Sequence, residues 1–91
     1  MCSRQRHGTE LSDVGRMVRV IVVAIVDYPD EVYIHEVEGS RTSVIEINVD
    51  RDDVGKVIGK QGIHADAIRK LVTAAGGKLR RRYEVNIIED R

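Results

Sequence analysis

The 91-residue chain is poor in aromatic side chains. Three tyrosines are its only aromatic residues, and it contains neither tryptophan nor phenylalanine. Domains that stack the bases of a single strand on an open β-sheet carry several aromatic side chains on adjacent strands. None of the tyrosines falls in the glycine-containing stretch described below. The composition therefore excludes a base-stacking sheet of the RRM type.

The chain also lacks a cysteine pair, a long apolar run and a metal-binding spacing. Its only cysteine, Cys2, has no disulfide partner, which is typical of the reducing cytosol. The most apolar run, Val20 to Val26, is far shorter than the ~20 residues of a membrane span, and the polar first residues argue against a signal peptide. His7 and His35 lie far apart, so we expect no metal and no other cofactor. These features predict a cytoplasmic protein without a membrane segment.

The net charge of the chain is zero, but its positive and negative residues are unevenly distributed along the sequence. The formal charge is zero at pH 7, yet residues 51–82 carry nine Lys or Arg against three Asp, which gives +6. Residues 1–50 carry five basic against nine acidic residues (−4), and residues 83–91 carry one against three (−2). A basic segment of this kind suits contact with phosphates, whereas the overall neutrality predicts modest affinity that weakens with salt.

The basic segment is built around the tetrapeptide Gly59-Lys60-Gln61-Gly62. Two glycines three residues apart allow a tight turn that another backbone can approach closely. A helical pattern begins just after Gly62, so its free N–H groups, its dipole and the Lys60 ammonium suit a phosphate. The alternative interpretation is an ordinary turn between two helices. Lys60 favours the phosphate site, because it lies inside the loop.

The glycine spacing excludes two common nucleotide-binding motifs. A dinucleotide fingerprint needs a glycine two residues before Gly59, where this chain has Val57. A P-loop needs four residues between its glycines, whereas three separate Gly55 from Gly59. No nucleophile is paired with a general base in a recognised pattern. We therefore expect no enzyme.

A family resemblance rests on the same stretch. The run from Val57 to Gly62, followed by Ala67-Ile68-Arg69, resembles the GXXG core of KH domains. Together with Gly55-Lys56 before it, and with Val44-Ile45-Glu46-Ile47 and Pro29-Asp30-Glu31-Val32 upstream, it is similar to the small single-domain bacterial KH family called KhpA. The similarity covers about residues 11–90.

The resemblance implies an α+β fold, the type II (prokaryotic) KH domain of order α-β-β-α-α-β, with a three-stranded sheet packed against helices. Residues 1–10 are predicted to be a disordered tail, and residues 11–91 the KH domain. The stretch from Leu11 to Val26 has helical spacing at 11, 14, 18, 21 and 25, but its β-branched residues equally favour a strand. The resemblance decides for a helix, which Pro29 ends.

The remaining elements follow from pattern. Residues 32–38 and 42–49 predict a hairpin. Asp50, with Asp53 three residues on, predicts a capped short helix before the loop. After the loop, Ile68, Leu71, Val72 and Ala75 predict the buried face of a helix that Gly76-Gly77 ends, with His64 on the same face. A final strand starts near Tyr83.

The resemblance implies a non-catalytic protein that binds single-stranded RNA in an apolar groove, as a regulator or RNA chaperone linked to cell shape. Its implied partners are a second copy, forming a homodimer, and a second KH-containing RNA-binding protein. The floor would combine Val57, Ile58 and Ile68 with Ile45 or Ile47 of the central strand. The predicted RNA-binding residues are Lys56, Val57, Ile58, Gly59, Lys60, Gln61, Gly62, Ile63, Ile68 and Arg69.

Two features leave a second interpretation open. Relatives often carry basic residues straight after the second glycine and three positions later, where this chain has Ile63 and Asp66. They favour a KH scaffold that docks a protein partner or dimerises and has only weak RNA affinity. The run from Arg80 to Arg82 either extends the basic surface or keeps a strand edge soluble.

Overall fold

Three helices and three strands follow one another in the predicted order. The computed structural model describes residues 11–90, so the predictions for the first ten residues, including Cys2, lie outside it. The elements are α1 (Asp13–Ile25), β1 (Tyr33–Glu38), β2 (Thr42–Asp50), α2 (Val54–Ile58), α3 (Ile63–Leu79) and β3 (Arg82–Asp90). Short 3₁₀ turns lie at Pro29–Glu31 (η2), Arg51–Asp53 (η3) and Lys60–Gly62 (η4). The α+β class and the α-β-β-α-α-β order are confirmed.

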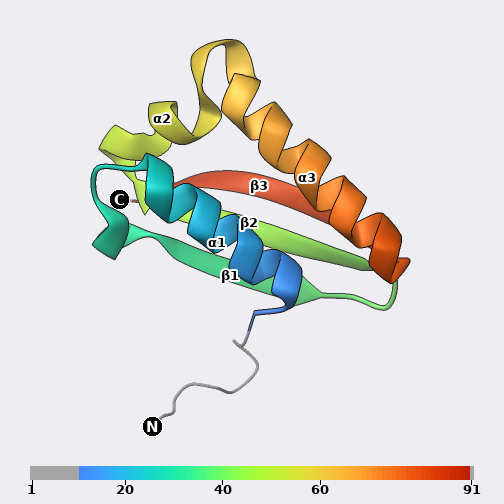
Figure 1. Cartoon of the computed structure of the whole chain (residues 1–91). Helices are drawn as coiled ribbons and strands as arrows, with labels where there is room; N and C mark the ends of the chain where they lie inside the picture. Colours follow the sequence, from blue (N-terminus) through green and yellow to red (C-terminus); the bar gives the residue numbers. More distant parts are fainter. Residues whose placement is uncertain (1–10, 91) are drawn as a thin grey trace, which may run out of the picture.

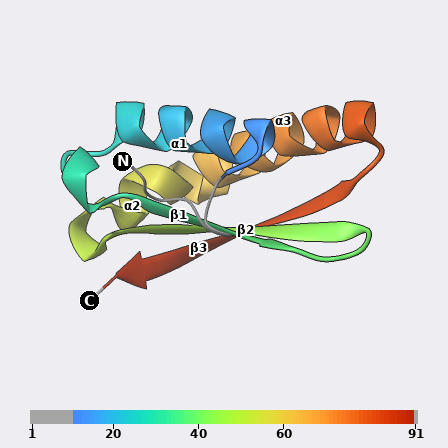
Figure 2. The ribbon, with the colours of Figure 1, turned by 90° about the horizontal axis from the view of Figure 1, so that it is seen from below.

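The elements form two layers, with α1 and α3 side by side over one face of the sheet (Figures 1 and 2). The strand order is β1-β2-β3, with β1 antiparallel and β3 parallel to the central β2. In Figure 2 no helix covers the other face. Within residues 11–90, none of the helices combines the length and the apolar character that a membrane span requires.

The ambiguous first segment is a helix because its apolar side chains form one buried stripe. Val14, Val18 and Val22 repeat every four residues, and their exposed fractions do not exceed 2%. They pack against the inward-facing side chains of β2, among them Ile45 and Ile47, which are fully buried. Tertiary packing of an amphipathic face therefore outweighs the strand propensity of the β-branched residues.

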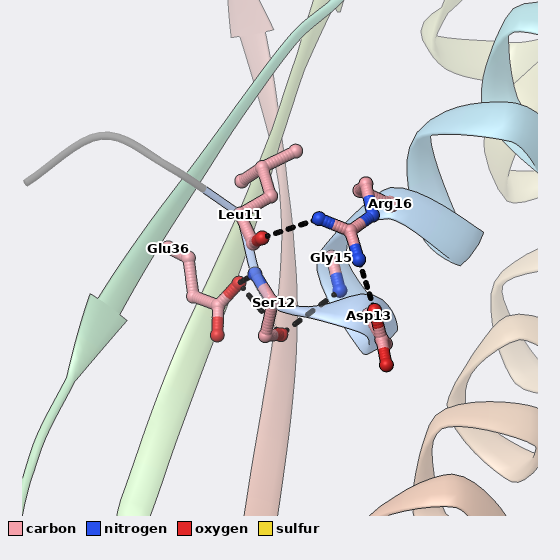
Figure 3. A network of polar contacts seen from close by, with 6 residues as sticks. All are labelled: Leu11, Ser12, Asp13, Gly15, Arg16 and Glu36. Carbon is pink, nitrogen blue, oxygen red and sulfur yellow. Dashed lines mark hydrogen bonds and ion pairs between the residues drawn. The ribbon is translucent and has the colours of Figure 1, made fainter. Parts of the chain in front are cut away.

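The first turn of α1 is tied to β1 by a small polar network (Figure 3). Ser12 caps the helix, since its hydroxyl accepts a hydrogen bond from the Gly15 amide at 3.2 Å. One Glu36 carboxylate oxygen accepts hydrogen bonds from the Ser12 amide and hydroxyl, at 3.1 and 3.0 Å. Arg16 donates to the Leu11 carbonyl and pairs with Asp13. The network fixes where α1 begins over the sheet.

Helix α3 does not end at its two glycines, so that prediction is wrong. It continues through Gly76 and Gly77 to Leu79, and Arg80 closes it with a left-handed φ of 58°. A Cβ at position 76 would lie 2.6 Å from the Arg81 carbonyl oxygen and 2.9 Å from the Tyr83 ring. Glycine at position 76 therefore lets the start of β3 come close to α3, and it does not end the helix.

Two further details of the predicted helices are wrong. Ile68 and Val72 are buried, but Leu71 is 51% exposed, because it lies on the outer side of α3. Asp50 caps η3 by accepting from the Asp52 amide, whereas Asp53 does not complete a capping box with it. The Asp53 carboxylate is fully buried and accepts hydrogen bonds from two backbone amides in the connection that follows α1.

Candidate nucleic-acid interface

The turn between α2 and α3 has the backbone conformation that its glycines predict. Gly59 and Gly62 have φ angles of 80° and 77°, and Gln61 between them is also left-handed at 59°. A Cβ on Gly59 would lie 2.7 Å from the His64 ring and 2.8 Å from its backbone nitrogen. A Cβ on Gly62 would meet no atom, so only its φ favours glycine there. The loop is therefore narrow on the α3 side and open at Gly62.

His64 closes this turn rather than packing in the core. Its ring is exposed, and Nδ1 lies 2.7 Å from the Lys56 carbonyl oxygen in the last turn of α2. Because a carbonyl oxygen only accepts, Nδ1 carries the hydrogen that it donates. The prediction of a core-facing histidine is wrong, although its polar atom does have a partner. The hydrogen bond joins the end of α2 to the start of α3 across the loop.

A groove of about 620 Å³ lies beside the loop. One wall consists of the turn and the first part of α3, and Ile87 contributes from β3. The apolar part of the lining comes from Ile58, Ile63, Ala65 and Ile87, and the polar part from Lys60, Gln61, Gly62, Asp66 and Arg69. An open, partly apolar groove beside a glycine turn can accept a flexible chain with an apolar face and a charged backbone.

The structure brings together most, but not all, of the predicted site residues. Ile58, Lys60, Gln61, Gly62, Ile63 and Arg69 line the groove, and Gly59 begins the turn at its rim. Val57 and Ile68 are outside the lining and belong to the buried core, at 0% and 2% exposed. Lys56 lies outside the lining, exposed on α2, with its ammonium 3.3 Å from the Asp27 carboxylate.

The floor of the groove differs from the one that the sequence predicts. Ile45 and Ile47, proposed for the floor, are fully buried in the core. Ile87 of β3 takes that place, with Ala65 from the first turn of α3. Ile87 stands opposite Ile47 in the parallel register, and the alternation of the last strand was the one signal that could have identified it.

The charges around the groove are arranged unequally. Lys60 is exposed and its ammonium has no ion-pair partner among residues 11–90. Asp66 is partly neutralised by Lys70, one turn along α3, at 3.3 Å. The Arg69 guanidinium donates to the Val85 carbonyl oxygen at 3.3 Å, so it is held between α3 and β3. A phosphate at the loop would therefore meet a free ammonium and the N–H groups at the start of α3.

The chemical groups at the groove were also compared with those of a metal site. In the part of the chain that the structure describes, no three His, Cys, Asp or Glu side chains gather where they could hold a metal ion. The His64 ring is engaged with a backbone carbonyl. What the groove presents is an apolar surface, the exposed Lys60 ammonium and backbone N–H groups.

Comparison with known proteins gives concordant matches. A model of the family described as "KhpA/KhpB, KH domain" matches residues 15–87. The chain is 48% identical over 75 residues to a protein named "RNA-binding protein KhpA" from Caldanaerobacter subterraneus subsp. tengcongensis, covering 82% of this chain and 100% of that one.

Proteins of the same name are similar in Aquifex aeolicus (42% identity; 87% of this chain, 100% of that one) and Borreliella burgdorferi (35%; 93% and 99%). The matched residues include both helices that flank the glycine turn and nearly all of the sheet. The resemblance noted in the sequence is confirmed.

Proposed function

Because the chain belongs to the KhpA/KhpB KH-domain family, we propose that it binds single-stranded RNA in the groove beside Gly59–Gly62 and catalyses no reaction. The observation that supports the proposal most strongly is that an apolar lining, a glycine turn and an exposed lysine lie next to one another. An apolar lining lies next to a left-handed glycine turn, and the exposed Lys60 stands in that turn. KH domains clamp about four nucleotides through a loop of this form.

Each part of a nucleotide has a matching partner in the groove. Phosphate oxygens can accept from the Lys60 ammonium and from N–H groups at the start of α3. Base faces can pack on Ile58, Ala65 and Ile87, and Gln61 offers an amide to a base edge or a ribose. Because the lining has no aromatic side chain, bases are held by van der Waals contact rather than by stacking. We expect weak binding with little sequence preference.

One observation favours a protein-docking role for the same surface. Ile63 is 62% exposed at the groove, directly after the second glycine. An exposed isoleucine suits an apolar partner, and the negative Asp66 beside it opposes a phosphate. Lys60 and the glycine turn have no evident use in that role, so we retain RNA as the ligand and protein docking as the second candidate.

The proposal includes the finer features that the family resemblance implies. They are action in the bacterial cytoplasm, a role in RNA regulation or as an RNA chaperone connected with cell shape, a homodimer, and pairing with a second KH-containing RNA-binding protein. They are carried over from the family resemblance, whereas the name of the relatives itself extends only to RNA binding. A second copy would also raise the effective affinity of such a small site by avidity.

Fluorescence anisotropy tests the proposal on the unmodified chain. We expect saturable binding of an eight-nucleotide single-stranded RNA, and weaker binding of a duplex of the same sequence, because paired bases cannot reach the apolar lining. The logarithm of the association constant should fall with the logarithm of salt concentration with a slope of about −0.7 to −1.4, as one or two phosphate contacts predict. Flat traces up to high micromolar protein would favour the docking role, and tighter binding of the duplex would contradict a site for single-stranded RNA.

A further inference from the structure

His64 lies directly behind the glycine turn, at the second position of α3. Its neighbours Ile63 and Ala65 line the groove, whereas His64 does not. The residue is exposed, yet its ring nitrogen Nδ1 is hydrogen-bonded to the Lys56 carbonyl oxygen at 2.7 Å. A side chain held beside the loop, but outside the groove, can affect the loop without contacting the ligand.

The ring completes the hydrogen bonding at the end of α2. In a continuous helix the amide four residues later, that of Lys60, would donate to the Lys56 carbonyl, but α2 ends at Ile58. The Gly59 amide donates to the Gly55 carbonyl at 2.8 Å. The next carbonyl, that of Lys56, accepts from the His64 ring. His64 therefore supplies a donor to the end of α2 from the following helix.

The same ring packs against the first glycine of the turn. A Cβ on Gly59 would lie 2.7 Å from the ring carbon Cγ of His64, and 2.8 Å from both Nδ1 and the backbone nitrogen. A Cβ on Gly62 would have no atom within 4 Å. The two glycines therefore have different roles. Gly59 makes room for the histidine, and Gly62 leaves the other side of the turn open to a ligand.

The turn is thereby closed at its base. The hydrogen bond joins Lys56 to His64, and Gly59–Gly62 lies between these two residues. Inside the turn, the Gly62 amide donates to the Gly59 carbonyl at 3.0 Å. Figure 1 shows the turn rising from the end of α2 and leading into α3. The bond from His64 fixes the separation of these two helix ends, and with it the position of Lys60.

A turn that is fixed in advance should bind RNA more tightly than a free one. Glycine gives a backbone wide conformational freedom, and this turn contains two glycines. A site that adopts its binding conformation only part of the time has an affinity reduced by that fraction. Ordering a loop during binding also costs free energy. A hydrogen bond across the base of the turn reduces both losses before the ligand arrives.

We propose that His64 is a positioning residue for RNA binding, whose hydrogen bond to the Lys56 carbonyl holds the glycine turn in the conformation that presents Lys60 to a phosphate. This inference rests on the proposed function, since it concerns the same site. It goes further by placing part of the RNA affinity in a side chain that does not contact the RNA.

The test measures the binding of a short single-stranded RNA by anisotropy for two variants of the full chain. His64→Leu keeps an apolar side chain of similar size and removes the donor. His64→Asn places an amide nitrogen near the position of Nδ1 and keeps a donor. We expect His64→Leu to weaken binding about three- to tenfold, as the loss of one hydrogen bond gives. His64→Asn should bind within about twofold of the parent.

Two further measurements separate positioning from contact with the RNA. Because His64→Leu removes no phosphate contact, its salt slope should equal that of the parent, whereas the loss of one contact would make the slope shallower by about 0.7. In the RNA-free chain, ¹⁵N relaxation should show greater mobility of residues 59–62 in His64→Leu than in the parent.

Ser12→Ala controls for a general loss of stability. It removes the N-cap of α1 and should lower the melting temperature by about 4–8 °C. Ser12 precedes the start of α1, which borders a hollow together with the last turns of α3. This is the end of α3 that lies away from the glycine turn, so RNA affinity should not change.

RNA affinity equal to that of the parent in His64→Leu would overturn the inference and leave the proposed function standing. Equal weakening by His64→Asn or by Ser12→Ala would do the same, and so would unchanged mobility of the turn. A shallower salt slope in His64→Leu would show that the ring contacts a phosphate itself, which contradicts a positioning role. Failure of the parent chain to bind the RNA would overturn the proposed function, and this inference with it.

Discussion

The double substitution Lys60→Asp, Gln61→Asp is expected to weaken the binding of single-stranded RNA about 10- to 100-fold. It removes the one ammonium in the glycine turn and places two carboxylates where a phosphate would lie. A charge-assisted hydrogen bond contributes about 1.5–3 kcal/mol, which corresponds to a change of this size in affinity. Anisotropy titration against the same short RNA measures the effect.

The substitution should leave the fold intact. Both side chains are exposed, and aspartate tolerates the left-handed conformation of position 61 better than most residues. Both glycines remain, which avoids the clash with His64 that any side chain at position 59 would create. The pair Arg19→Asp, Val20→Asp changes the net charge equally on the exposed side of α1. If this control weakened binding as much, the loop would have no special role.

Asp53→Ala is expected to lower the free energy of unfolding by about 3 kcal/mol. The Asp53 carboxylate is fully buried, and its two oxygens accept from the amides of Asp27 and Tyr28 at 3.1 and 3.0 Å. Alanine would leave both amides without their acceptor. A loss of this size should lower the melting temperature of a 91-residue chain by roughly 15 °C.

The neighbouring Asp52 provides a matched control for this experiment. It is exposed, so Asp52→Ala removes the same charge and should change the melting temperature by no more than about 3 °C. Asp53→Asn keeps one acceptor oxygen and should give an intermediate loss. Similar melting temperatures for Asp53→Ala and Asp52→Ala would show that the buried carboxylate does not hold the α1–β1 connection against α2.

The local sequence pattern was sufficient to predict those parts of the fold that depend on neighbouring residues alone. The hairpin predicted for residues 32–38 and 42–49 is present as β1 and β2. The two glycines correctly gave a tight turn, because both adopt positive φ angles that other residues avoid. For α1, propensity and periodicity disagreed, and only the family resemblance selected the helix.

Features that depend on long-range contacts could not be predicted in this way. Ile87 joins the groove only because β3 pairs in parallel with β2. Asp53 has its partners some 25 residues earlier in the chain, so its sequence neighbourhood suggested a cap. Gly76 was predicted to end the helix. Its actual role depends on contact with Arg81 and Tyr83, which forms only when the chain turns back beside α3.

The central claim is that RNA occupies the groove beside the glycine turn. It is tested most directly by following the backbone amide signals of the isotopically labelled chain by NMR during titration with a four-nucleotide RNA. We predict that the largest shifts occur at residues 58–66, at Arg69 and at Ile87, which surround the groove. Shifts confined to the uncovered face of the sheet, around Tyr33 and Val37, with the glycine turn unchanged, would contradict the account.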